Sequence, residues 1–301
     1  MVKASPPTDK KEKRPLLKRI EGRWFLFGSH LTLFAVAIAH YNLPRSALQI
    51  VLAYVVAVGT ELGLHFWLKK YPKATTWDRT LSAASEAAGL LLLVRSTLWY
   101  YYAIGCFIAV AGKYVFTRHD SVHVFNPTNF AIIVGLALFP INTFELNPDE
   151  YSISTYAIFH VMAFGIFAIA FGGTYLVTIG YYLGLLFCAV FAKAFLTTGW
   201  VGILYPELGA FGTIFAFLMI TDPRTTPARQ SYRFLFGLAV AVMVITLRSM
   251  QVSFPNFVAL FLVTLATFAL SFKYRGIYKK PAPKLPPDPP VAAESALPLG
   301  E

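Results

Sequence analysis

The sequence predicts an all-α polytopic membrane protein, and three observations lead to that fold class. Hydrophobic residues make up 56% of the 301-residue chain, whereas charged residues make up only 14%, compared with about 25% in soluble domains. The charges are concentrated at the two ends and in short loops between apolar runs. No soluble core of this length needs so much apolar surface, so we expect the chain to cross a lipid bilayer repeatedly.

Ten apolar runs mark the candidate membrane segments. They fall at 24–40, 46–67, 81–94, 99–117, 127–140, 155–172, 175–196, 209–220, 231–247 and 254–272. A full span needs roughly 20 residues, so the runs at 81–94 and 209–220 are too short to cross alone. At about 1.5 Å per residue they cover about 18–21 Å of a hydrocarbon core about 30 Å thick. We therefore expect ten transmembrane segments, two of which are half-helices.

The distribution of basic residues orients these segments. With the N-terminus placed inside, 22 of the 26 Lys and Arg residues fall on the inner side, and the acidic loop INTFELNPDEYS falls outside. The positive-inside rule then predicts that both termini are cytoplasmic. The expected location is the cytoplasmic (inner) membrane. The net charge of +11 reports this topology. It does not predict nucleic-acid binding, because the basic residues are not gathered on one face.

An internal repeat divides the chain. The stretch FNPTNFAIIVGLALF in the first half aligns with FPNFVALFLVTLATF in the second, and each follows a short apolar run, a polar break and a full span. Each repeat holds five segments, an odd number, so the two copies are expected to be inverted in the membrane. The predicted divisions are a basic cytoplasmic tail (1–23), repeat 1 (24–140), an external acidic loop (141–154), repeat 2 (155–275) and a disordered Pro-rich cytoplasmic tail (276–301).

The stretch FLMITDPRTTPARQ, residues 217–230, ends an apolar run on a polar turn. Pro223 and Pro227 cannot continue a helix, and lipid cannot satisfy the freed backbone groups. The FNPTN turn breaks the pattern in the same way on the same predicted side. We therefore expect the two turns to lie close together and to share one polar cavity, with Asp222 either capping a turn or meeting a ligand.

Three stretches resemble the RnfD/NqrB family, the membrane subunits of Rnf and sodium-pumping NADH:quinone oxidoreductase complexes. They are YPKATTWDRTLSAASEAAGLLLL (71–93), GKYVFTRHDSVHVFNPTNFAI (112–132) and FLMITDPRTTP (217–227). The resemblance covers about 24–275. It implies ten spans in two inverted repeats, a bound flavin, and electron transfer between partner subunits at the membrane. The chain would then be at most a flavin-bearing subunit of a larger oxidoreductase.

The chain departs from this family at one motif. Family members carry an S-G-A-T-type motif between spans five and six, and its Thr takes FMN through a phosphodiester. The corresponding loop here, INTFELNPDEYSIST, has no Gly-Ala-Thr. Covalent FMN is therefore not expected, which leaves a non-covalent flavin or none.

The candidate cofactor-binding residues gather at the helix breaks. Amide and hydroxyl groups there suit the donor and acceptor edge of an isoalloxazine ring, but they serve equally well as helix caps and turn formers. Glu86 is an ionisable group inside a short apolar helix, either functional or paired with Arg79 or Lys113. Lys113 either holds a flavin phosphate or follows the positive-inside rule. The full set is Asn126, Pro127, Asn129, Thr221, Asp222, Thr225, Thr226, Glu86 and Lys113.

Other side chains suggest weaker alternatives. Glu61 and His65 lie one turn apart, with His30 at a comparable depth; paired histidines can ligate haem, although a satisfied polar network is the expected role. Cys106 and Cys188 lie inside apolar runs and are expected to pack. Three functions remain open: a flavin-bearing subunit of a redox complex, a stand-alone relative that feeds electrons to another partner, and a transporter or channel built on the inverted repeat.

Overall fold

In the computed structural model the chain is described for residues 22–40, 45–68, 75–118, 122–140, 143–146, 155–195, 200–274 and 276–278. Helices dominate these residues. The first half contains α1 (Gly22–His40), α2 (Ala47–Leu68), α3 (Thr76–Leu93), α4 (Tyr101–Val115) and α5 (Pro127–Leu138). The second half contains α7 (Thr155–Gly172), α8 (Tyr175–Phe195), α9 (Trp200–Leu208), α10 (Ala210–Ile214), the π-helix η3 (Phe215–Met219), α11 (Gln230–Ser249) and α12 (Pro255–Lys273).

Each of the ten apolar runs forms helix, and the differences from the predicted bounds have local causes. Helix α3 starts five residues before the run at 81–94, because the Thr75 hydroxyl accepts from the Asp78 amide while the Asp78 carboxylate accepts from the Thr75 amide. This capping box satisfies backbone groups at the helix start. Helix α9 was not predicted. It contains Pro206, and it precedes the short helix that the run at 209–220 did predict.

The described residues also contain one short pair of strands, which the sequence analysis did not predict. Two three-residue strands, β1 (Val94–Ser96) and β2 (Phe144–Leu146), pair antiparallel with Arg95 opposite Glu145. Strand β1 follows directly on the short helix α3, where the backbone loses its helical partners. Pairing with β2, a segment of the acidic loop, satisfies those backbone groups. The tails 1–21 and 279–301, and the rest of the acidic loop apart from Thr143, lie outside the described residues.

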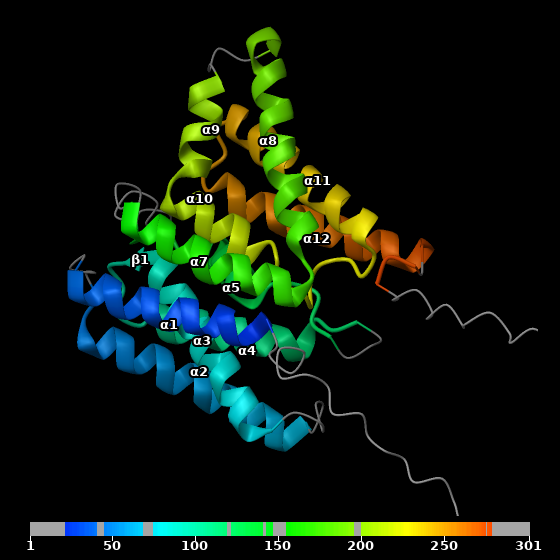
Figure 1. Cartoon of the computed structure of the whole chain (residues 1–301). Coiled ribbons are helices and arrows are strands. Elements are labelled where there is room, and N and C mark those ends of the chain that lie inside the picture. The colour runs from blue at the N-terminus through cyan, green and yellow to red at the C-terminus, as the bar shows by residue number, and fades with distance from the viewer. Residues whose placement is uncertain are drawn as a thin grey trace, which may run out of the picture.

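The helices pack into two halves that meet along α1, α5, α7 and α12 (Figure 1). In the first half, α2 packs on α3 and α4, and α4 packs on α5. In the second half, α8 packs on α11, and α11 packs on α12. Contacts of α1 with α7 and of α5 with α12 join the halves. The breaks that end η3 and begin α5 are therefore brought to the junction of the two halves.

The surface of the described residues is that of a helical membrane protein. Among the described residues, helices α2, α11 and α12 are long and apolar enough to cross a membrane, judged by length and composition. Large apolar side chains cover the outside: Val55, Phe159 and Val190 are 62%, 66% and 66% exposed. So many exposed apolar side chains are costly in water and suit lipid.

Candidate functional site

The two predicted helix breaks lie against one another. The Asn126 amide Nδ2 donates to the carbonyl oxygen of Met219 at 3.5 Å, and His123 Nε2 lies 3.3 Å from Asp222 Oδ2. These contacts join segments more than 90 residues apart in sequence. The predicted proximity of the FNPTN turn and the turn after Ile220 is confirmed, while their placement on the cytoplasmic side stays a prediction.

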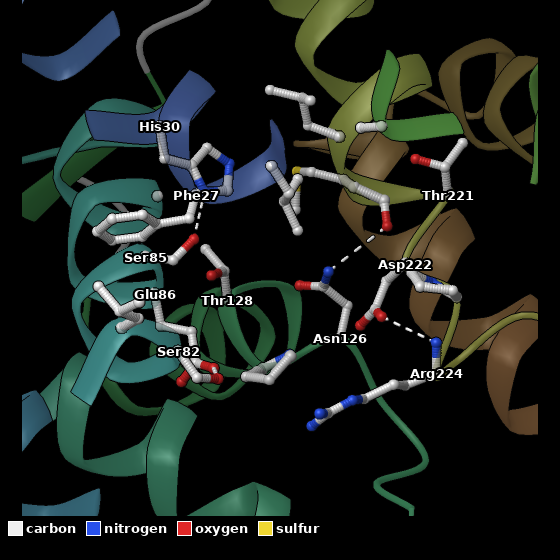
Figure 2. A pocket seen from close by; sticks show the side chains of 18 of the residues that line it. Phe27, His30, Ser82, Ser85, Glu86, Asn126, Thr128, Thr221, Asp222 and Arg224 are labelled. Atoms are coloured by element: carbon white, nitrogen blue, oxygen red, sulfur yellow. Dashed lines mark hydrogen bonds between the residues drawn. The ribbon is translucent and has the colours of Figure 1, made fainter. Parts of the chain in front are cut away.

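A cavity of about 150 Å³ opens between these turns and helices α1 and α3; we call it the break cavity. Figure 2 shows its polar side chains, which come from four separate segments of the chain. Both polar and apolar side chains line the cavity. The polar lining residues include His30, Ser82, Ser85, Glu86, His123, Asn126, Thr128, Thr221, Asp222 and Arg224, and the apolar ones include Trp24, Phe27, Leu218 and Met219.

Local sequence explains why helix α5 starts at the cavity. The Asn126 side chain accepts from the Asn129 amide at 3.0 Å, and Pro127 occupies the first helical position. Asn is among the best N-cap residues, and Pro at the first position has no amide hydrogen to leave unsatisfied. Because the Asn126 carbonyl oxygen of the side chain caps the helix, its Nδ2 is turned toward Met219.

The turn after η3 is built by Asp222 and its neighbours. Asp222 Oδ1 accepts from the Arg224 amide at 3.0 Å, and the Asp222 carbonyl accepts from the Thr226 amide at 3.1 Å. Thr221 donates its hydroxyl to the Phe217 carbonyl at 2.5 Å. These bonds replace the helical partners that Pro223 and Pro227 remove. Asp222 thus caps a turn with one carboxylate oxygen and faces His123 with the other.

Helix η3 delivers this turn through a π-helical bulge. The Ile220 amide donates to the Phe215 carbonyl at 3.1 Å, an i to i−5 bond. Such bulges insert an extra residue, rotate the following side chains and are frequent at functional sites. Leu218 and Met219 at the end of η3, and Thr221 just after it, line the break cavity.

The His123–Asp222 pair carries the local electrostatics. Burial lowers the pKa of His123 and outweighs the bond to Asp222, so this pKa lies below its ordinary 6.5, and neutral imidazole is favoured at neutral pH. Burial raises the pKa of Asp222, but the hydrogen bond and charge of His123 and the Arg224 amide lower it more, so it lies below 3.8. Near neutral pH, therefore, a neutral imidazole donates to an ionised carboxylate.

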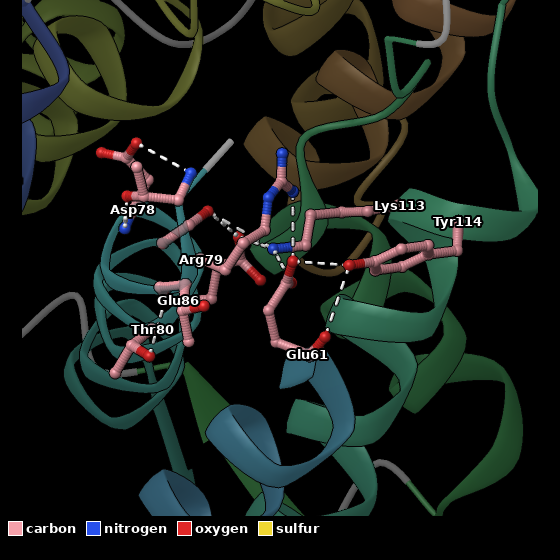
Figure 3. A network of polar contacts seen from close by, with 10 residues as sticks. Glu61, Asp78, Arg79, Thr80, Glu86, Lys113 and Tyr114 are labelled. Carbon is pink, nitrogen blue, oxygen red and sulfur yellow. Dashed lines mark hydrogen bonds and ion pairs between the residues drawn. The ribbon is translucent and has the colours of Figure 1, made fainter. Parts of the chain in front are cut away.

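One wall of the cavity leads into four buried charged residues, Glu61, Arg79, Glu86 and Lys113, which we call the charge cluster (Figure 3). The Lys113 ammonium lies 2.7 Å from Glu61 Oε2 and 2.7 Å from Glu86 Oε1. Arg79 pairs with Glu61 Oε1 at 3.1 Å. The prediction that Glu86 pairs with Arg79 or Lys113 is confirmed for Lys113. The cluster holds two positive and two negative groups, which is how buried charges are tolerated.

The break cavity takes in only part of the predicted site. Asn126, Pro127, Thr221, Asp222 and Glu86 line it, whereas Asn129, Thr225, Thr226 and Lys113 lie outside its wall. Asn129 is 1% exposed and is the third residue of α5. Thr225 donates its hydroxyl to the Asp222 carbonyl at 3.3 Å and so serves the turn. Lys113 is held inside the charge cluster.

Several lining residues were not predicted for this site. Ser82, Ser85 and Thr128 face the cavity, and the His30 Nδ1 atom lies 2.7 Å from the Ser85 hydroxyl. The Ser-rich start of helix α3 was the available signal, since serine hydroxyls in an apolar helix need a polar partner. His123 gave no signal, because its partner Asp222 is 99 residues away.

The two histidines considered as haem ligands contact other side chains. The His30 Nδ1 atom lies 2.7 Å from the Ser85 hydroxyl, and the His65 ring lies beside Phe66. Within these residues there is no group of three or more His, Cys, Asp or Glu side chains placed to hold a metal ion. Both Cys106 and Cys188 are free thiols; Cys106 is buried.

Comparisons with known proteins leave the family open. No protein-family model matches the chain, and no curated protein matches it in sequence. A function therefore has to be inferred from the geometry of the break cavity and the charge cluster.

Proposed function

We propose that this protein is an RnfD/NqrB-like integral membrane electron-transfer subunit that holds a non-covalent flavin in the break cavity and passes electrons to or from partner redox proteins. The observation that carries the proposal is the convergence of two helix breaks, far apart in sequence, on one cavity with donors and acceptors around it. Irregular backbone inside a membrane protein is tolerated where it lines a working site.

The wall chemistry fits the pyrimidine edge of an isoalloxazine, which carries alternating carbonyl and N–H groups. The Thr128 and Ser85 hydroxyls both donate and accept, and the Asn126 amide offers both groups. Trp24 and Phe27 supply aromatic surface beside them. A cavity of about 150 Å³ is the size that takes a single benzene ring. The ring therefore enters by one edge, with the rest of the flavin outside the cavity.

The helix arrangement supports the proposed inverted repeat of ten segments. The pair α2 and α4 in the first half has its counterpart in α8 and α11, and α4 packs on α5 as α11 packs on α12. The helices that join the halves, α1 with α7 and α5 with α12, occupy equivalent positions in the two repeats. A pseudo-two-fold axis relating the repeats produces such self-pairs.

The absorbance spectrum of the full chain, purified in detergent and incubated with riboflavin or FMN, tests the proposal. We expect flavin absorbance to stay with the protein on gel filtration and to be released on denaturation, with no fluorescent band on a denaturing gel. The isosteric change Thr128→Val removes one cavity hydroxyl and is expected to weaken retention about 10-fold, the effect of one lost hydrogen bond.

Thr264→Val is the matched control, since Thr264 is also buried but lies on α12 and does not line the cavity. Equal flavin retention by the two variants would place the flavin elsewhere. A preparation that retains no flavin under any condition would remove the proposal altogether.

A transporter or channel is the second candidate, and one observation favours it. Charged groups line or adjoin a cavity at the junction of the two halves, where inverted-repeat transporters bind solutes. Solute or ion flux into proteoliposomes, together with a spectrum free of cofactor, would favour this function over electron transfer.

A further inference from the structure

A second cavity, of about 610 Å³, lies at the other end of segment 210–219. Leu218 and Met219 line the break cavity, whereas Gly209 and Phe211 line this second one. At about 1.5 Å per residue the two cavities are about 15 Å apart. The end of α11 and the start of α12 complete the wall, so this cavity opens at the opposite end of the helices from the break cavity.

The polar end of the second cavity is an ion pair with unequal exposure. Glu207 is 1% exposed and accepts from the Tyr181 hydroxyl at 2.6 Å, from Asn256 Nδ2 at 2.9 Å and from Arg248. The Arg248 side chain is 27% exposed. Both carboxylate oxygens are therefore occupied from the protein side. Arg248 lines the cavity, and its Nη2 also donates to Asn256 Oδ1 at 3.5 Å. A ligand group at this end meets a hydrogen-bond donor rather than an acceptor.

Most of the remaining wall is apolar or aromatic, and Gln251 and Tyr205 add polar groups to it. Phe211, Phe254 and Phe257 line it, with Ile158, Leu208 and Val252 around them. A volume of about 610 Å³ lies in the range of sites that hold small organic ligands, about 300–1,000 Å³. One cationic end and a long apolar body select an amphiphile with an anionic head.

The position of the cavity indicates the source of that amphiphile. Arg248 is in the last turn of α11, where an arginine of a membrane helix reaches the level of the lipid headgroups. In the predicted topology this is the outer side, which carries few other basic residues. We propose that the second cavity binds an anionic membrane phospholipid, with its phosphate on Arg248 and an acyl chain against the phenylalanine wall. This inference needs the bilayer setting proposed above but not the flavin.

Lipid titration of the full chain, delipidated in detergent, tests the proposal with phosphatidylglycerol as the probe and native mass spectrometry as the readout. The double variant Glu207→Gln/Arg248→Gln removes both charges together, so neither is left buried alone. We expect it to bind phosphatidylglycerol about 10- to 100-fold more weakly than the wild type, the effect of losing a charge-assisted hydrogen bond. Equal binding by the two proteins would overturn the proposal.

The apolar wall is tested separately. Leu208→Trp fills part of the cavity from a side chain that is already 56% exposed, and it should weaken binding of phosphatidylglycerol. Leu235→Trp on α11 is the control, since Leu235 is 54% exposed and lies outside the cavity. The same loss in both variants would contradict a role for this wall.

Two further probes separate the chemical sources. Oleate carries a carboxylate on one chain, and inorganic phosphate carries the headgroup charge with no chain. We expect phosphatidylglycerol to displace oleate and inorganic phosphate to bind too weakly to compete. If oleate binds as tightly as phosphatidylglycerol, or if phosphate alone competes, the assignment to a phospholipid is wrong. A blank flavin spectrum leaves all these outcomes unaffected, so the two proposals fail independently.

Discussion

Helix pairs α2–α4 and α8–α11 occupy matching places in the two halves, yet they are held together in different ways. Between α2 and α4 the contact is electrostatic, because Lys113 of α4 pairs with Glu61 of α2 at 2.7 Å, and the Tyr114 hydroxyl donates to Glu61 Oε1 at 2.7 Å. Between α8 and α11 the contact is steric, and glycine residues let the backbones approach closely. One helix pair is therefore joined through buried charges, and the other through close backbone packing.

The small residues follow a Gly-x-x-x-Gly spacing. Gly180 and Gly184 of α8 lie against the backbone of Phe234 and the side chain of Ala241 on α11. A Cβ atom at Gly237 would lie against the carbonyl oxygen of Val177 and 2.9 Å from the Tyr181 amide nitrogen, and one at Gly184 would lie 2.7 Å from Ala241 Cβ. Small-xxx-small contacts drive helix association in lipid, where there is no hydrophobic force between helices.

The two halves are therefore sensitive to different kinds of substitution. The α8–α11 contact depends on shape and tolerates no added atoms. The α2–α4 contact depends on charge balance, because removing one partner leaves another charge buried. Burying the charge cluster costs desolvation energy, but it also places an ionisable group at the break cavity, since Glu86 lines that cavity.

The largest effect is expected from Lys113→Met. Without the ammonium, Glu61 and Glu86 share a buried site with only Arg79 to balance them, so the free energy of unfolding should fall by about 3–5 kcal/mol. Thermal unfolding in detergent measures the change. Lys273→Met, at an exposed position, is the control.

The double variant Lys113→Met/Glu86→Gln sharpens this test. It removes one charge of each sign and leaves the Arg79–Glu61 pair, so it should be more stable than Lys113→Met alone. If the double variant is no more stable, charge balance does not explain the cluster.

Gly237→Ala should break the steric contact. Its methyl group would displace backbone of α8, and overpacking of this kind costs about 1–3 kcal/mol. Gly59→Ala in α2 is the matched control, since no atom lies within 4 Å of a Cβ there and alanine favours the helix. Equal thermal stability of the two variants would show that the glycine contact is not tight.

Asn126→Ala should cost about 1 kcal/mol by removing the N-cap of α5. Asn126→Asp keeps the capping oxygen but loses the Nδ2 donor to Met219. We expect it to retain most of the stability measured by thermal unfolding. Equal losses in the two variants would mean that the contact between the two breaks, and not the cap, is what matters.

The smallest effect is expected for pH, since a single histidine is involved. The folded-state pKa of His123 lies below its ordinary 6.5, so the unfolded chain binds more protons as the pH falls below about 6.5. The stability from this group is complete above that pH and is lost as the pH falls through the folded pKa. His123→Gln should flatten this part of the stability profile, and an unchanged slope would assign it to another group.

The sequence by itself determined the features with local causes. Apolar runs predicted where helix forms, including the start of α5 at Pro127. Prolines 223 and 227 predicted the break after η3, and the need to satisfy freed backbone groups predicted that the two breaks meet. Hydrophobicity and capping depend on residues within a few positions of one another, so they can be read along the chain.

Only the tertiary structure decided which distant side chains meet. Lys113 bridges Glu61 and Glu86, which come from two other helices, and His123 meets Asp222 across the junction of the halves. The β1–β2 pairing, helix α9 and the second cavity likewise depend on how helices pack. A charged or polar side chain within an apolar run has several candidate partners of the right sign, and the crossing angle and rotation of its helix select among them.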